Sequence, residues 1–125
     1  MFQVDIMSRV PVYEQIVEQL EQFVLTGVMK EGDKLPSVRA LSMQLVVNPN
    51  TIQKAYSELD RRGLIRSVPG RGCFVTEEAL HIASGKKKEQ LTDLMELVKE
   101  LLYAGVTREE LMQVIQQAAT EIGKQ

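Results

Sequence analysis

Apolar side chains recur at every third or fourth position in the first stretch of the chain. Between Pro11 and Thr26 they fall on one side of an α-helix, at Val12, Ile16, Val17, Leu20, Phe23 and Val24. Pro11 suits the first helical turn, and Gly27 can adopt the left-handed conformation that ends a helix. We therefore predict a core helix over Pro11–Thr26, followed by a turn over Lys30–Pro36.

Two shorter helices follow, and a proline separates them. Ser37 can cap the first, whose inner side chains are Val38, Leu41 and Leu45. That helix ends by Val47, because Pro49 disfavours helical geometry in Asn48, and the same dipeptide offers a cap and a first turn to the next helix. The third helix reaches about Arg62, and its predicted buried residues are Ile52, Ala55, Tyr56 and Leu59. Two short helices meeting across such a turn predict a helix-turn-helix.

Two brief strands joined by a proline–glycine turn come next. We predict them over residues 64–67 and 73–76, on either side of a loop that contains Pro69 and Gly70. This dipeptide suits the central positions of a type II turn, the second of which needs a positive φ. Arg71 then lies at the hairpin tip, and we take Cys73 as a small buried strand residue. The order of elements predicts a winged helix-turn-helix over residues 1–76.

Residues 77–88 are predicted to be a small, polar linker that ends in three lysines. Helical spacing returns over residues 89–125, where Thr107 and Glu110 form a capping box at the start of a second helix. Apolar helix faces of this size are expected to pack against other protein, because each large apolar side chain left in water forgoes about 1.5–3 kcal/mol of burial free energy. We predict a two-helix tail for dimerisation and leave open that it is a core for its own chain. The predicted dimer contacts are Leu91, Leu94, Met95, Val98, Leu101, Leu102, Leu111, Val114 and Ile115.

Composition narrows the range of functions. The 125 residues are 44% hydrophobic and 26% charged, as in an ordinary globular protein, with a net charge of −2. The single cysteine and single histidine leave no disulfide framework and no His-based triad, and no metal-ligand spacing or phosphate-binding loop occurs. We expect no enzyme, no cofactor and no metal site. No apolar run is long enough to cross a bilayer, and we expect a cytoplasmic protein with no membrane partner.

Positive charge is concentrated in one segment. Residues 36–76 carry six basic and two acidic side chains, a local charge of +4, and the basic ones are Arg39, Lys54, Arg61, Arg62, Arg66 and Arg71. The outward positions at the start of the third helix are Asn50, Thr51, Gln53, Lys54 and Ser57. Asparagine and glutamine pair bidentately with adenine, and a helix N-terminus offers N–H groups to phosphate. This pattern favours DNA contact over an ordinary solvated face.

Four blocks of sequence resemble the DNA-binding domain of the GntR family, and the short tail is similar to that of its YtrA subfamily. The blocks are Pro11–Ile16, Gly32–Ser42, Asn50–Tyr56 and Leu59–Phe74. The resemblance implies that Arg39 contacts DNA, that Asn50, Thr51 and Gln53 contact bases and phosphates, and that Gly70 and Arg71 form the wing tip. Several family members carry arginines where this chain has Pro49 and Gln53, so the operator sequence does not carry over.

We therefore predict a sequence-specific DNA-binding transcription regulator. It would be a homodimeric repressor on a palindromic, double-stranded operator, and the subfamily resemblance implies transporter-type operons. The alternative is a winged-helix protein-interaction module without DNA binding. A small-molecule effector of unknown identity is left open. The predicted DNA contacts are Ser37, Arg39, Asn48, Asn50, Thr51, Gln53, Lys54, Gly70 and Arg71.

Overall fold

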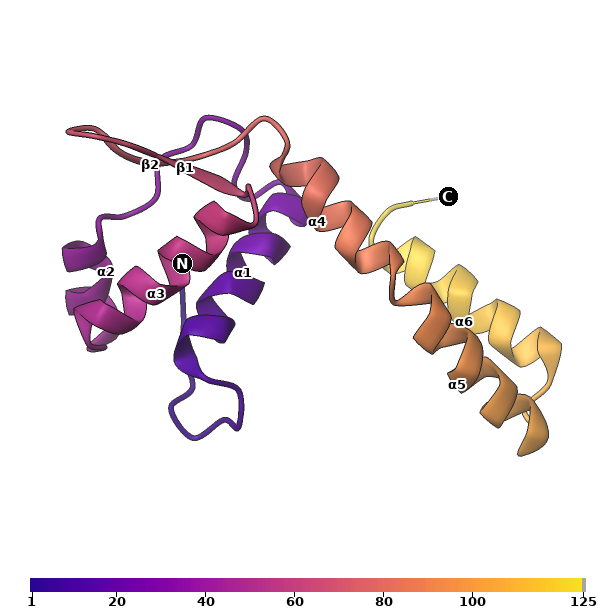
Figure 1. Cartoon of the computed structure of the whole chain (residues 1–125). Helices are drawn as coiled ribbons and strands as arrows, with labels where there is room; N and C mark the ends of the chain where they lie inside the picture. Colours follow the sequence, from indigo (N-terminus) through magenta and orange to yellow (C-terminus); the bar gives the residue numbers. More distant parts are fainter. Residues whose placement is uncertain (125) are drawn as a thin grey trace. The chain divides into compact units, whose positions relative to one another are not determined.

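The structure, a computed structural model, describes residues 1–124 and forms two compact units, Met1–Lys86 and Lys87–Gln125 (Figure 1). Its elements in chain order are α1 (Val12–Thr26), α2 (Val38–Leu45), α3 (Pro49–Arg61), β1 (Ile65–Val68), β2 (Gly72–Val75), α4 (Ala79–Lys88), α5 (Leu91–Tyr103) and α6 (Arg108–Glu121). The predicted fold class, mostly helical with a small β-hairpin, is confirmed. Over the residues described, every helix is too short or too polar to cross a bilayer.

Helices α1, α2 and α3 begin and end close to where the sequence predicts. The hydroxyl oxygen of Ser37 accepts a hydrogen bond from the Ala40 N–H at 3.0 Å, which caps α2. Asn48 Oδ1 accepts one from the Asn50 N–H at 2.8 Å, which caps α3. Gly27, with φ of +80°, ends α1 in the left-handed conformation. Local chemistry therefore sets these helix boundaries.

A buried serine holds the turn between α2 and α3. The hydroxyl of Ser42 donates to the carbonyl oxygen of Val47 at 2.5 Å, and the Val47 N–H donates back to the Ser42 carbonyl at 3.1 Å. Val46, between them, has φ of +55°, a left-handed conformation that is unfavourable for a β-branched residue. The two hydrogen bonds hold the turn in this conformation and fix where α3 begins.

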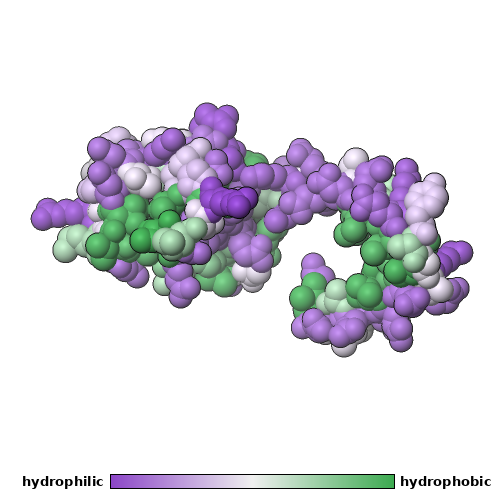
Figure 2. Space-filling view, turned by 90° about the horizontal axis from the view of Figure 1, so that it is seen from below, coloured by the Kyte–Doolittle hydropathy of each residue, from purple (hydrophilic) through white to green (hydrophobic). Residues whose placement is uncertain are grey.

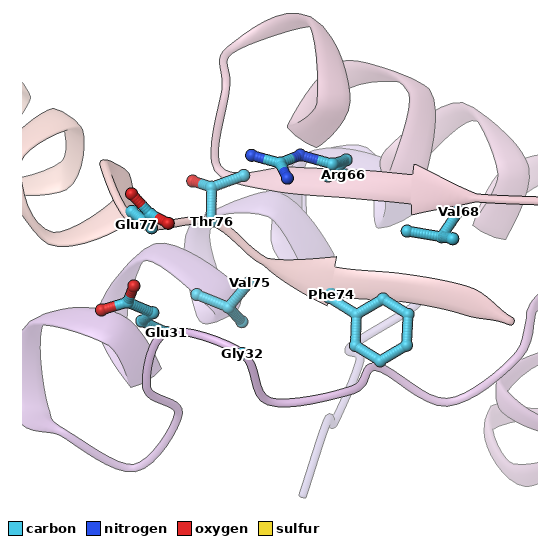
Figure 3. A pocket seen from close by; sticks show the side chains of 8 residues that line it. All are labelled: Glu31, Gly32, Arg66, Val68, Phe74, Val75, Thr76 and Glu77. Carbon is cyan, nitrogen blue, oxygen red and sulfur yellow. The ribbon is translucent and has the colours of Figure 1, made fainter.

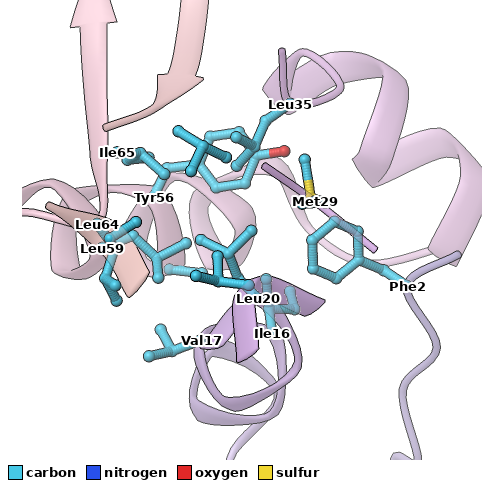
Figure 4. Close-up of a cluster of buried hydrophobic side chains, with 14 of the residues drawn as sticks. Phe2, Ile16, Val17, Leu20, Met29, Leu35, Tyr56, Leu59, Leu64 and Ile65 are labelled. Carbon is cyan, nitrogen blue, oxygen red and sulfur yellow. The ribbon is translucent and has the colours of Figure 1, made fainter. Parts of the chain in front are cut away.

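The core of the first unit lies between α1, α3 and the hairpin (Figure 4). All four predicted inward residues of α3, namely Ile52, Ala55, Tyr56 and Leu59, are buried. They pack with Ile16 and Leu20 of α1 and with Leu64 and Ile65 at the start of the hairpin, all at most 2% exposed. Val12, Phe23, Val38 and Leu45 pack half-buried around this cluster. One face of α3 is thus fully buried, which leaves the other for solvent or a ligand.

The hairpin forms a wing, with its strands shifted by one residue from the prediction. β1 and β2 pair antiparallel, with Ile65 opposite Val75 and Val68 opposite Gly72. Between them the Arg71 N–H donates to the Val68 carbonyl at 2.9 Å, and Gly70 has φ of +74°. With Pro69 ahead of the glycine, this is the geometry of the predicted type II turn.

A third extended segment pairs with the wing, and here the prediction of a turn over all of Lys30–Pro36 is wrong. The Leu35 N–H donates to the Cys73 carbonyl at 2.9 Å, and the Val75 N–H donates to the Asp33 carbonyl at 2.9 Å. These bonds join residues about forty positions apart in the sequence, so no local periodicity indicates them. Cys73 itself is half-buried rather than buried.

The segment predicted as a polar linker is largely helical. α4 spans Ala79–Lys88, and Ala79 and Ala83 are each 1% exposed. Their small side chains let the helix lie close to the rest of the first unit: a Cβ on Gly63 would stand 3.1 Å from Ile82 Cδ1. The sequence gives only a weak apolar pattern for this helix, because its buried residues are alanines and the residues that follow them are Gly and Lys.

The first residues of the chain lie along α1, an arrangement that no pattern in the sequence indicates. Phe2 is buried, and its ring meets that of Phe23 edge to face at 5.2 Å between centroids. The Gln15 side-chain amide donates to the Asp5 and Val10 carbonyls at 2.9 and 2.8 Å, and Gln19 Oε1 accepts the Gln3 N–H at 2.9 Å. The two glutamines of α1 thus hold the N-terminal segment in place.

The second unit has no buried side chain in either of its helices. The predicted capping box is present, with Glu110 N–H donating to Thr107 Oγ1 at 3.1 Å and Thr107 N–H donating to Glu110 Oε1 at 3.0 Å. Val98, Leu101 and Leu111 are half-buried, and the other predicted dimer contacts are exposed. The two helices alone therefore do not build a core.

The Tyr56 hydroxyl gives the first prediction. It donates to the Pro36 carbonyl at 2.6 Å, which ties the segment before α2 to α3, and burial raises the pKa of Tyr56. Tyr56→Phe leaves that carbonyl without its partner, so we expect a loss of about 1–3 kcal/mol in unfolding free energy. Urea titration followed by circular dichroism measures it. Tyr103→Phe, at a position 93% exposed, is the control, and equal losses in the two variants would contradict the assignment.

Candidate nucleic-acid interface

The N-terminal end of α3 presents amide and hydroxyl groups outside the core. Asn50 and Gln53 are exposed, and Thr51 is half-buried. Gln53 Nε2 donates to the Ser57 hydroxyl at 3.2 Å along the same face. The first turn holds no acidic side chain, so the positive end of the helix dipole is uncompensated. This end of α3 is therefore suited to base edges and phosphate oxygens.

Ser37 and Asn48, which we predicted as DNA contacts, each use a side-chain oxygen inside the protein. Both oxygens cap helices, as described above. Each side chain still has a hydrogen-bond donor: the NH₂ group of Asn48 and the hydroxyl proton of Ser37. Their first role is to fix the two helix N-termini.

Lys54 is held by an aromatic ring of α1. Its Nζ lies 4.1 Å from the centroid of the Tyr13 ring, a cation–π distance. The Tyr13 hydroxyl in turn hydrogen-bonds Glu14 Oε1 at 3.1 Å. Lys54 remains exposed, and its contact with Tyr13 gives its charge a defined place on the surface of α3.

Two of the six cations counted in the sequence are neutralised by carboxylates. Arg62 Nε lies 3.0 Å from Glu58 Oε1, and Arg62 Nη1 lies 3.2 Å from Glu21 Oε1. Arg61 also pairs with Glu58. The hydrogen bonds from Arg61 and then Arg62 lower the pKa of Glu58 to about 2. The local charge of +4 therefore overstates what the C-terminal end of α3 offers to a polyanion.

The other four cations have no ion-pair partner within residues 1–124; they are Arg39, Lys54, Arg66 and Arg71. The structure adds Lys34, which lies just before the segment counted in the sequence. A Cβ on Gly72 would stand 2.9 Å from Lys34 Cε, so the lysine stem lies against β2 where that strand leaves the turn of the wing. Lys34 is exposed and supplies a further positive charge there.

Arg71 follows the turn at the tip of the wing and is exposed. The positive φ of Gly70 makes this tight tip, so the predicted role of Gly70 is one of backbone shape. In Figure 1, α2, the N-terminal end of α3 and the wing tip point toward the same side of the first unit. Residues far apart in the sequence thus contribute to one side of the molecule.

The outer face of the wing carries mixed charge. A hollow of about 250 Å³ lies there, and Figure 3 shows Arg66 and Phe74 on its strands with Glu31 and Glu77 at one end. The carboxylates make this part of the wing a poorer surface for phosphates than the tip. Over residues 1–124, no group of three or more His, Cys, Asp or Glu residues is arranged to hold a metal ion.

Comparisons with known proteins agree on one family. The sequence profile of "Bacterial regulatory proteins, gntR family" matches residues 12–75. The HTH-type transcriptional repressor YtrA of Bacillus subtilis (strain 168) is 42% identical over 98% of this chain and 95% of its own. A GntR family transcriptional regulator from Listeria monocytogenes is 34% identical with a TM-score of 0.72, over 91% of this chain and 98% of that one. AraR(DBD) in complex with operator ORX1 is 30% identical with a TM-score of 0.54, over 61% and 96%.

The Glu58 pairs predict a pH dependence of stability. The folded-state pKa of about 2 lies below the ordinary value of 4.5, so the pairs stabilise the fold fully above pH 4.5 and lose that contribution as the pH falls toward 2. We expect the unfolding free energy of Glu58→Gln to fall less steeply over this range than that of the unaltered protein. Urea titrations at a series of pH values measure both slopes. Parallel slopes would contradict the pairing.

Proposed function

The chain belongs to the gntR family of bacterial regulatory proteins, and from this we propose that it is a sequence-specific DNA-binding transcription repressor that acts as a homodimer. It would occupy a palindromic operator and block transcription by its presence there. No chemical step is needed for this function. Such a protein would act in the cytoplasm, where the chromosome of a bacterial cell lies.

The observation that carries the proposal is the N-terminal end of α3. One face of α3 is fully buried, so the exposed side chains on the other face contribute little to the core. Asn50 and Gln53 have the donor and acceptor pairs that read base edges in the major groove. The positive end of the helix dipole, with no acidic side chain in the first turn to offset it, favours a nearby phosphate.

The cations around this end of α3 suit the DNA backbone. Arg39 is exposed in the first turn of α2, and Lys54 stands on Tyr13. Arg71, at the narrow wing tip, suits a minor groove or a line of phosphates. Phosphate contacts fix the register of the protein, and contacts from α3 give the sequence preference.

The relatives support the same function. YtrA is named as a repressor, and the AraR domain is described as bound to an operator. YtrA matches nearly the whole length of this chain, so the tail as well as the winged domain has a counterpart in that repressor.

The second unit supports a homodimer. Hydrophobic side chains gather on its surface in Figure 2, and Leu91, Met95, Val114 and Ile115 are each at least 56% exposed. Because α5 and α6 leave these faces uncovered, a second copy is the proposed cover. A two-fold dimer would place two α3 helices about 34–36 Å apart, one turn of DNA.

A protein-interaction module is the alternative outcome, in which the winged domain and tail bind other proteins and no DNA. The exposed amides of α3 and the unpaired cations around it fit this alternative less well than they fit DNA. The small-molecule effector stays a prediction, and its chemistry is not proposed.

The DNA contacts give the next prediction, measured by fluorescence anisotropy on a duplex selected from random sequences. Asn50→Ala is expected to lose about 1–3 kcal/mol of binding free energy on the selected duplex and little on a scrambled one, because it reads bases. Arg71→Ala should weaken both and reduce the salt slope by about one, because it contacts phosphate.

Arg108→Ala is the control, since it removes the same charge from the second unit. An affinity for DNA that depends on neither sequence nor salt would contradict DNA recognition by this surface. So would an Arg108→Ala variant that binds DNA as weakly as Arg71→Ala.

The dimer gives a further prediction. Leu94→Glu places a charge on the apolar face of α5, and we expect a monomer in sedimentation equilibrium at concentrations where the unaltered protein is a dimer. Thr92→Glu adds the same charge at an exposed polar position of the same helix and should leave the dimer intact. A monomeric unaltered protein, or a dimer that survives Leu94→Glu, would refute this assembly.

A further inference from the structure

A buried carboxylate joins three helices of the first unit. Glu21 lies on the inner face of α1, and its side chain is 7% exposed. Its Oε1 accepts from Arg62 Nη1 at 3.2 Å and from Lys86 Nζ at 3.0 Å. A buried carboxylate is stable only with such partners, so Glu21 requires both cations nearby.

The Arg62 side of this cluster fixes the C-terminal end of α3. Arg62 is the C-cap residue of α3, and its Nε also pairs with Glu58 Oε1 at 3.0 Å. The guanidinium thus bridges a carboxylate of α1 and one of α3.

The Lys86 side fixes the last turn of α4. Ala79, Ile82, Ala83 and Lys86 share one face of that helix, at spacings of three and four residues. The first three pack against the body of the unit, with Ala79 and Ala83 buried and Ile82 over Gly63. Lys86 continues this face and ends it on Glu21.

The run Lys86-Lys87-Lys88 therefore contains residues in unlike settings. Lys86 pairs with a buried carboxylate, whereas Lys87 and Lys88 are exposed and have no carboxylate partner within residues 1–124. Nothing in the sequence distinguishes these three consecutive lysines from one another.

We propose that Glu21, Arg62 and Lys86 form a clasp that holds the last turn of α4 to the C-terminal end of α3, and that Lys86 is thereby a positioning residue for operator recognition. The proposal rests on the proposed function. α4 leads from the winged domain into the dimerising unit, so its attachment limits the distances at which two α3 helices meet DNA. A stiff attachment favours one spacing of half-sites, and a loose one accepts several.

The test compares Lys86→Met with Lys87→Met and Lys88→Met, which remove the same charge from the same run. Dissociation constants are measured by anisotropy on the selected duplex, on duplexes with one half-site moved by a single base pair or by about half a helical turn, and on a single half-site. For Lys86→Met we expect the preference for the selected spacing to fall roughly 2- to 30-fold. Affinity for the single half-site should match that of the two controls.

Lys86→Arg keeps the charge and should keep the spacing preference. Retention of the full preference in Lys86→Met, or an equal loss in Lys87→Met, overturns the positioning role. So does a loss confined to single half-site affinity, since that reports a plain phosphate contact.

Hydrogen exchange of the α4 amides separates this proposal from the function on which it rests. Faster exchange in Lys86→Met than in Lys87→Met supports the clasp in the protein without DNA, and unchanged exchange overturns it. If the unaltered protein selects no duplex, the proposed function fails and the role in spacing fails with it, whatever the exchange shows of the clasp.

Discussion

The packing of α3 against α1 is the contact on which the rest of the structure depends. Ile52, Ala55, Tyr56 and Leu59 fill one face of α3 so completely that its other face takes no part in the core. Because Asn48 caps the helix and Ser42 fixes the turn before it, the exposed first turn also has a defined place. A helix anchored in this way can insert its N-terminal end into a groove without disturbing the fold.

The positive side chains at the two ends of α3 differ in whether a carboxylate neutralises them. Glu58 and Glu21 neutralise Arg61 and Arg62 near the C-terminal end, where the helix meets α1 and α4. Near the N-terminal end Lys54 has only an aromatic ring as partner. An acidic protein with a net charge of −2 can therefore still present a local positive surface to a polyanion.

Much of the first unit could be predicted from sequence, because its signals are local. Ser37, Asn48, Gly27 and the Pro69-Gly70 turn each determine structure within a few residues, and the apolar stripes identify the buried faces. What escaped prediction depends on partners far along the chain. The backbone bonds of Leu35, the burial of Phe2 and the pairing of Lys86 with Glu21 leave no periodic signal. The interface was likewise predicted by residue type, whereas the neutralisation of Arg62 required the fold.

A crystal structure of the protein bound to its selected duplex tests the central claim most directly. The account requires two copies related by a two-fold axis, each with the first turn of α3 in the major groove and with Asn50 and Gln53 within hydrogen-bond distance of base edges. The wing tip would then lie against the adjacent backbone or minor groove. DNA seated on another surface, or α3 touching no base, would contradict it.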